Sequence, residues 1–110
     1  MSSGEPPLLL EHPSDVIVAS GEPLTLKCRT AGTPTPRIDW YQRRPAAASS
    51  TASSEAARVE AGAHRIQLPD GSLFFIRATE ADDAGLYWCV ARNDHGDVTS
   101  KTARVEIACK

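Results

Sequence analysis

The chain has 110 residues and a formal net charge of −2 at pH 7, which fits one domain and gives no overall attraction to nucleic acid or to an anionic membrane surface. No run reaches the roughly 18 apolar residues that a membrane span requires, and no signal-peptide pattern opens the chain. We therefore expect one domain over residues 7–108, a flexible leader over 1–6 and a tail over 109–110, with neither nucleic acid nor membrane as a partner of this fragment.

Short segments rich in β-branched and apolar residues alternate with turns made of Gly, Pro, Asp and Asn. This rhythm indicates an all-β sandwich or barrel. The first strand is expected at residues 16–18. In the next strand, residues 24–29, the side chains of Leu24, Leu26 and Cys28 alternate toward the core, and those between them point outward.

The middle of the chain predicts a further strand at residues 37–42 and then a segment of different composition. Residues 45–62 begin as an Ala/Ser-rich stretch without periodicity, so we expect a mobile excursion between two strands. Within it, the Ala and Glu content of residues 55–61 favours one turn of helix.

Two hairpins complete the expected sandwich. Residues 65–68 and 72–77 flank an Asp-Gly turn, which is a strong hairpin signal. Residues 86–92 and 99–107 are expected to pair as the last hairpin, around a turn that contains Asn, Asp and Gly.

Cys28, Trp40 and Cys89 form the strongest core signal. Two distant cysteines with a tryptophan between them predict an inter-sheet disulfide packed against the indole, as in an immunoglobulin-like I-set sandwich. Closing a loop of roughly 60 residues would stabilise the fold by about 4 kcal/mol in the chain-entropy model. A structural disulfide also implies an oxidising compartment. Cys109 is left over, as a free thiol, an intermolecular bridge or part of a tag.

The run that leads into Cys89 adds a second structural signature. Tyr87 stands two residues before the cysteine, where a tyrosine corner is expected. Gly85 permits a close approach at this turn, and we expect Asp83 to pair with Arg65. These side chains, with Trp40, are assigned to the structural core rather than to a ligand.

The sequence argues against an enzyme and predicts no metal or cofactor. The three histidines, His12, His64 and His95, are scattered over different loops. No cysteine pair has zinc-ligand spacing, and no glycine-rich phosphate loop is present. A small antiparallel sandwich also lacks a deep pocket.

Residues 73–76 carry four large apolar side chains in succession. Because side chains alternate across a sheet, Phe74 and Ile76 must point away from the core. Such an exposed apolar patch often marks an interface. The alternative is that the 45–62 excursion or the N-terminal segment covers it.

Charged side chains are expected beside this patch. Lys27 and Arg29 point outward from the strand that neighbours residues 73–76 in sandwiches of this type, and Glu11 lies at the adjoining edge. Trp88 is a second candidate contact, since it faces outward from the other sheet unless a neighbouring strand or the excursion covers it.

Several short segments carry a family pattern. They are EHPSD at 11–15, GEP at 21–23, PTP at 34–36, HRI at 64–66, LP at 68–69, GSLFF at 71–75 and CVARN at 89–93. Together they resemble the first immunoglobulin domain of Roundabout (Robo) axon-guidance receptors, over about residues 7–108.

The resemblance implies a function and a site. In that family this domain binds the concave face of a leucine-rich-repeat domain of the secreted protein Slit, as the extracellular portion of a single-pass receptor. Carried over by motif, the protein-binding residues are Glu11, Lys27, Arg29, Phe74 and Ile76.

Some expectations remain open. The segment 78–82 is short and acidic, unlike the longer basic segment that many relatives use for heparan sulfate. Weak heparan sulfate binding could instead use Lys27, Arg29, Lys101 and Arg104. The alternatives to a Slit receptor module are an adhesion module, homophilic or heterophilic, and an intracellular structural I-set domain with reduced cysteines.

Overall fold

The computed structural model describes residues 4–44, 56–62 and 64–108. The described part contains eleven strands and one helical turn. They are β1 (Glu5–Glu11), β2 (Val16–Ala19), β3 (Leu24–Leu26), β4 (Arg29–Thr33), β5 (Arg37–Arg43), β6 (Ala56–Arg58), β7 (Arg65–Gln67), β8 (Leu73–Phe75), α1 (Glu80–Asp83), β9 (Gly85–Asn93), β10 (Gly96–Thr99) and β11 (Ala103–Ala108).

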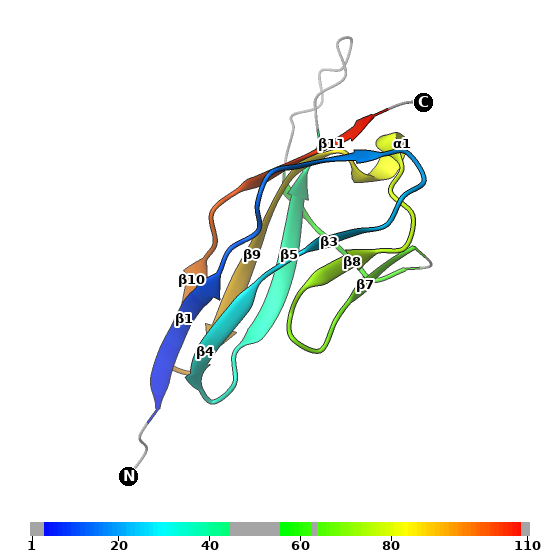
Figure 1. Cartoon of the computed structure of the whole chain (residues 1–110). Helices are drawn as coiled ribbons and strands as arrows, with labels where there is room; N and C mark the ends of the chain where they lie inside the picture. Colours follow the sequence, from blue (N-terminus) through cyan, green and yellow to red (C-terminus); the bar gives the residue numbers. More distant parts are fainter. Residues whose placement is uncertain (1–3, 45–55, 63, 109–110) are drawn as a thin grey trace.

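The strands form two layers, which confirms the all-β immunoglobulin-like sandwich (Figure 1). One layer contains β1 paired with β4, and β3–β8–β7. The other has the order β2–β11–β9–β5–β6, with β10 also paired to β9. The β3 and β4 strands are separated only by Lys27 and Cys28, so the two parts of the first layer follow one continuous stretch of chain. We call these the first layer and the second layer.

The predicted disulfide joins Cys28 to Cys89 and is confirmed. Both cysteines are fully buried, and Trp40 lies in the same core cluster. The indole Nε1 of Trp40 donates a hydrogen bond of 2.7 Å to the carbonyl oxygen of Gly71. This bond satisfies the one polar group that the indole brings into the core.

A network of buried polar groups holds the turn before β9. The Tyr87 hydroxyl donates a hydrogen bond of 2.6 Å to the main-chain oxygen of Asp83. The Asp83 carboxylate accepts a hydrogen bond from the Thr79 amide at 2.7 Å and lies 3.1 Å from His64 Nε2 and 3.6 Å from Arg65 Nη1. Burial raises the pKa of the Tyr87 hydroxyl above its ordinary value, so the hydroxyl remains a donor at physiological pH.

The close approach of β9 to β5 depends on Gly85. Its φ angle is +140°, in the region that favours glycine. A Cβ atom at this position would lie 2.6 Å from the main-chain oxygen of Arg43. A side chain at position 85 would therefore require the β5 backbone to move.

Three expectations about strands and helices require correction. The first strand is β1, not residues 16–18, and it starts at Glu5 inside the expected leader. Residues 56–58 of the expected helical turn form β6, because pairing with β5 overrides the helix preference of alanine. The last hairpin is interrupted: β10 and β11 both pair with β9, but residues 100–102 between them are not in a strand.

Two other findings concern the described ranges alone. Their single helix, α1, has four residues, so no helix there has the length and apolar character needed to cross a membrane. The same ranges contain no group of three or more His, Cys, Asp or Glu side chains placed to hold a metal ion. Residues 45–55 of the expected excursion and Cys109 lie outside the described part.

Candidate binding surface

The pairing of β8 with its neighbours sets which apolar side chains face outward. Leu73 and Phe75 are buried in the core. Phe74, between them, is half-buried on the outer side, and Ile76 just beyond the strand is 49% exposed. The alternation predicted for residues 73–76 is therefore what the structure shows.

Ile66 adds a third apolar side chain that the sequence reasoning did not single out. It lies directly opposite Phe74 in the β7–β8 pairing and is 39% exposed. The signal was present in the sequence, because an Asp-Gly hairpin with its arms at 65–68 and 72–77 brings 66 opposite 74. Directly opposed side chains on one face of a sheet contact each other.

The turn between β7 and β8 fixes this register. The Asp70 carboxylate accepts a hydrogen bond of 2.9 Å from the Ser72 amide. This hydrogen bond, ahead of smaller effects, lowers the pKa of Asp70 below its ordinary value. Gly71 adopts a φ angle of +100°, and a Cβ there would lie 2.3 Å from Cδ1 of Ile38. The tight turn therefore needs both the acid and the glycine.

The charged part of the surface lies where β1 meets β4. Glu11 and Arg29 are paired across these strands. The Glu11 carboxylate lies 4.0 Å from Lys27 Nζ and 3.9 Å from Arg29 Nη1, and both basic side chains are largely exposed. Exposed ion pairs at such distances contribute only about 0–1 kcal/mol, so a partner can replace them at little cost.

The structure thus brings all five predicted binding residues to the first layer. The charged and apolar parts adjoin, because Lys27 follows β3 directly and Thr25 of β3 lies opposite Phe74. We name the set Glu11, Lys27, Arg29, Ile66, Phe74 and Ile76 the first-layer surface. Within the described ranges, neither expected cover pairs with β8: the N-terminal strand β1 pairs with β4, and β6 pairs with β5 in the second layer.

The four residues suggested for heparan sulfate do not share one sheet. Lys27 and Arg29 belong to the first layer, whereas Arg104 is on β11 in the second layer and Lys101 precedes that strand. A linear sulfated chain cannot use them as one flat patch.

Trp88 is partly covered by its own neighbours in the second layer. Its ring stacks on Tyr41, with centroids 6.1 Å apart and planes 11° from parallel. The Arg43 guanidinium carbon lies 5.6 Å from the centre of the Trp88 ring. One of the covers that the sequence allowed, the strand that carries Tyr41, is therefore present.

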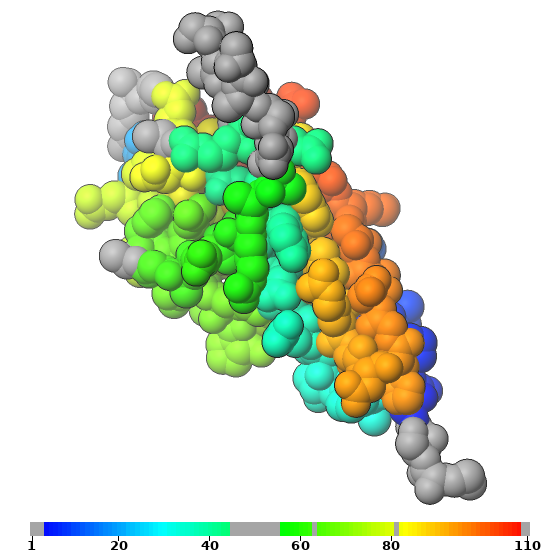
Figure 2. Space-filling view, turned by 180° about the vertical axis from the view of Figure 1, so that it is seen from behind, coloured from blue at the N-terminus to red at the C-terminus, as the bar shows by residue number. Residues whose placement is uncertain are grey.

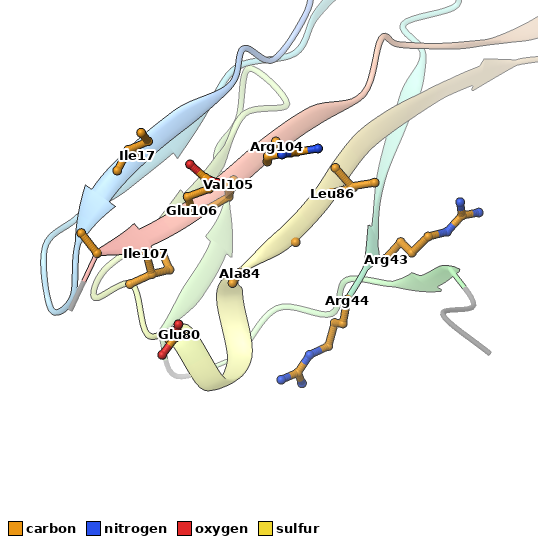
Figure 3. Close-up of a pocket in the computed structure, with 12 residues that line it drawn as sticks. Ile17, Arg43, Arg44, Glu80, Ala84, Leu86, Arg104, Val105, Glu106 and Ile107 are labelled. Atoms are coloured by element: carbon orange, nitrogen blue, oxygen red, sulfur yellow. The ribbon is translucent and has the colours of Figure 1, made fainter. Parts of the chain in front are cut away.

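A shallow groove of about 680 Å³ lies in the second layer, beside α1. The residues that line it include the apolar side chains of Leu86 and Ile107 and the charged side chains of Arg43, Arg104 and Glu106 (Figure 3). Among the described residues, those that line it include no histidine, cysteine or serine. The groove therefore presents charged and apolar groups but no nucleophile paired with a base.

Comparisons with known proteins identify a family profile, sequence relatives and a structural neighbour. A profile of the immunoglobulin domain family matches residues 6–93. Over 107 residues the chain is 44% identical to human Roundabout homolog 2 and 43% identical to human Roundabout homolog 1. These matches cover 94% of the chain but only 7% and 6% of those two proteins. A solved complex of titin M10 with an obscurin-like 1 immunoglobulin domain contains a chain with a TM-score of 0.76 and 29% identity, over 97% of this chain and 98% of that one.

Proposed function

The chain belongs to the immunoglobulin domain family and is closely related to the Roundabout receptors, and from this premise we propose that it is the ligand-binding module of a Roundabout-like axon-guidance receptor. The proposed partner is a leucine-rich-repeat domain of a Slit-like secreted protein. Immunoglobulin domains and the Roundabout relatives are structural and receptor modules, so the proposed role is recognition rather than catalysis, in the extracellular portion of a single-pass cell-surface protein.

The observation that carries this proposal is the apolar centre of the first-layer surface. Ile66 lies on β7, Phe74 on the adjacent β8 and Ile76 just beyond β8, and each exposes part of its side chain. Removing apolar area from water contributes roughly 25 cal/mol per Å², so a partner that covers these side chains gains most of its affinity there.

The charged side chains give the surface specificity for its partner. Lys27 and Arg29 flank Glu11, so the cluster presents both signs within a few ångströms. Charges at the rim of an interface mainly speed association and exclude wrong partners. The layer is a broad sheet face, which suits the extended concave surface that stacked repeats create.

The test is a calorimetric titration of the domain with the second leucine-rich-repeat domain of Slit. Phe74→Ala should weaken binding by about tenfold or more, as expected for a central aromatic contact. Unchanged affinity in this variant would remove the site from consideration, and the absence of binding by the unmodified domain would remove the partner.

A matched pair of isoleucine variants separates the surface from general effects. Ile76→Ser lies on the first-layer surface, whereas Ile17→Ser lies on β2 in the second layer and is 70% exposed. Only the first should lower the affinity. Equal losses in both would mean that the second layer contributes as much as the first.

A further inference from the structure

The outer face of the second layer carries a group of arginines around one buried acid. Along β5 the side chains of Ile38, Trp40 and Gln42 are buried, and those of Arg37, Asp39, Tyr41 and Arg43 alternate to the other side. The neighbouring strands add Arg92 and Trp88 from β9 and Arg58 from β6. We name this set, Arg37, Asp39, Tyr41, Arg43, Arg58, Trp88 and Arg92, the arginine face. Figure 2 shows the molecule from behind, where β6 in green lies against β5 in cyan with β9 in gold beyond.

Asp39 anchors three of these arginines. Its carboxylate accepts hydrogen bonds from Arg58 Nη2 at 3.1 Å and from Arg92 Nη1 at 3.2 Å, and it lies 3.9 Å from Arg37 Nε. Asp39 itself is buried beneath them. A guanidinium has five N–H donors, so these contacts fix the groups and leave most of the donors directed to solvent.

The arrangement leaves positive charge uncompensated. Arg37 and Arg92 lie opposite each other in the β5–β9 pairing and share one oxygen of the Asp39 carboxylate, so a single negative charge there faces two guanidinium groups. Asp97, opposite Arg92 on β10, is the second acid on this face. Among the residues that the structure describes on this face, four arginines thus accompany two carboxylates, whereas the whole chain has a net charge of −2. A second carboxylate, bound by Arg37 and Arg92 on their solvent side, would supply the negative charge that this pair still lacks.

An aromatic platform adjoins the arginines. Tyr41 and Trp88 stack on each other, and Arg43 lies against the Trp88 ring. The Tyr41 hydroxyl is the largest cause that raises the pKa of Arg92, which is consistent with the platform lying beside the charged cluster. Tyrosine, tryptophan and arginine are the residues that most often dominate the energy of protein interfaces.

We propose that the arginine face is a second binding site, which takes an acidic segment of a partner protein through carboxylates held between Arg37 and Arg92. A neighbouring aromatic or apolar side chain of the segment lies against Tyr41 and Trp88. The planar guanidinium fork matches a carboxylate bidentately. The ring platform favours a peptide over a sulfated polysaccharide, since a uniformly charged, hydrated chain would leave it unused. The site does not depend on the proposed function, because it lies on the other layer.

The probe is a short fluorescein-labelled peptide of alternating glutamate and tyrosine, followed by anisotropy. Arg37→Glu should weaken its binding by about tenfold, because it replaces an attraction with a repulsion. Arg37 is 79% exposed in its side chain and is the most distant of the three from Asp39, so this variant should fold normally. Arg43→Glu, at the other end of the face, provides a second variant if the first does not fold.

Arg77→Glu is the matched control. It changes the net charge equally, is exposed, and follows β8 in the first layer. Arg77→Glu should change the affinity for the peptide by less than about twofold, because this charge lies outside the proposed contact. Equal losses in Arg37→Glu and Arg77→Glu would overturn the proposal, because they would indicate general electrostatic attraction.

Two further arms test the chemistry of the ligand. Replacing the tyrosines of the probe with serine should weaken binding to the unmodified domain, and no change would overturn the role of the platform. A heparin-derived oligosaccharide that bound through Arg37 more tightly than the peptide would overturn the assignment to an acidic protein segment.

Discussion

Ile66 and Phe74 face each other directly across the β7–β8 ladder, on the outer side of the first layer. A directly opposed pair of this type contributes about 0.2–1 kcal/mol to the stability of the fold. If a partner covers both, they should also be coupled in binding. We therefore expect Ile66→Ala and Phe74→Ala together to cost less affinity than the sum of the single variants, measured as a double-mutant cycle by calorimetry. Strict additivity would indicate that the partner contacts them separately.

Asp83→Ala should destabilise the domain by roughly 3–5 kcal/mol, as loss of one member of a buried charge pair does. The substitution leaves the Thr79 amide without its acceptor and removes the charge partner of the largely buried Arg65 guanidinium, which keeps its hydrogen bond to Gln42 Oε1. Urea unfolding measures this loss in the free energy of unfolding. In conditions where the variant remains folded, its affinity for the partner should not change, and a changed affinity would connect this network to the binding surface.

Tyr87→Phe should lower the free energy of unfolding by about 1–3 kcal/mol, since it leaves the buried main-chain oxygen of Asp83 without its donor. Tyr41→Phe is the control, because its side chain is half-buried on the outer face. Its effect should stay within about 0.5 kcal/mol. Equal losses in urea unfolding would mean that the corner hydrogen bond adds nothing specific.

The Cys28–Cys89 bridge should be present in the native domain and should lower the intact mass by two hydrogens under non-reducing conditions. Reduction should cost about 4 kcal/mol of stability, because the closed loop is long. Intact-mass spectrometry measures the mass difference, and unfolding with and without reductant measures the loss of stability. A fully reduced native protein would favour the intracellular structural alternative.

The pKa of Asp70 should lie below its ordinary value of 3.8, because the folded carboxylate accepts the Ser72 amide hydrogen bond. A lowered folded-state pKa means that this stabilisation is complete above the unfolded pKa and is lost as the pH falls through the folded value. An NMR titration of the carboxyl carbon measures the pKa. A value at or above 3.8 would show that the turn bond is weak in solution.

The core and much of the candidate binding surface could be predicted because they depend on local rules. Cys28, Trp40 and Cys89 identify the sandwich by type and spacing alone. The alternation of side chains along a strand was enough to predict that Phe74 and Ile76 point outward.

The elements that sequence reasoning missed depend on contacts between distant segments. Pro6 and Pro7 weaken a strand signal, yet residues 5–11 form β1 because β4 supplies the pairing. Residues 56–58 prefer a helix but serve as an edge strand. The arginine face brings together three strands, so only the aligned registers show that Arg37, Arg58 and Arg92 share one acid.

The shortness of β6 and β7 has a consequence for self-association. Each is the last strand on one side of its layer and has three residues. A long open edge would recruit strands from other copies and nucleate aggregates. Here each edge offers few free amide and carbonyl groups, and Arg58 places a charge at the end of one of them. These two edges are therefore poor templates for edge-to-edge polymerisation.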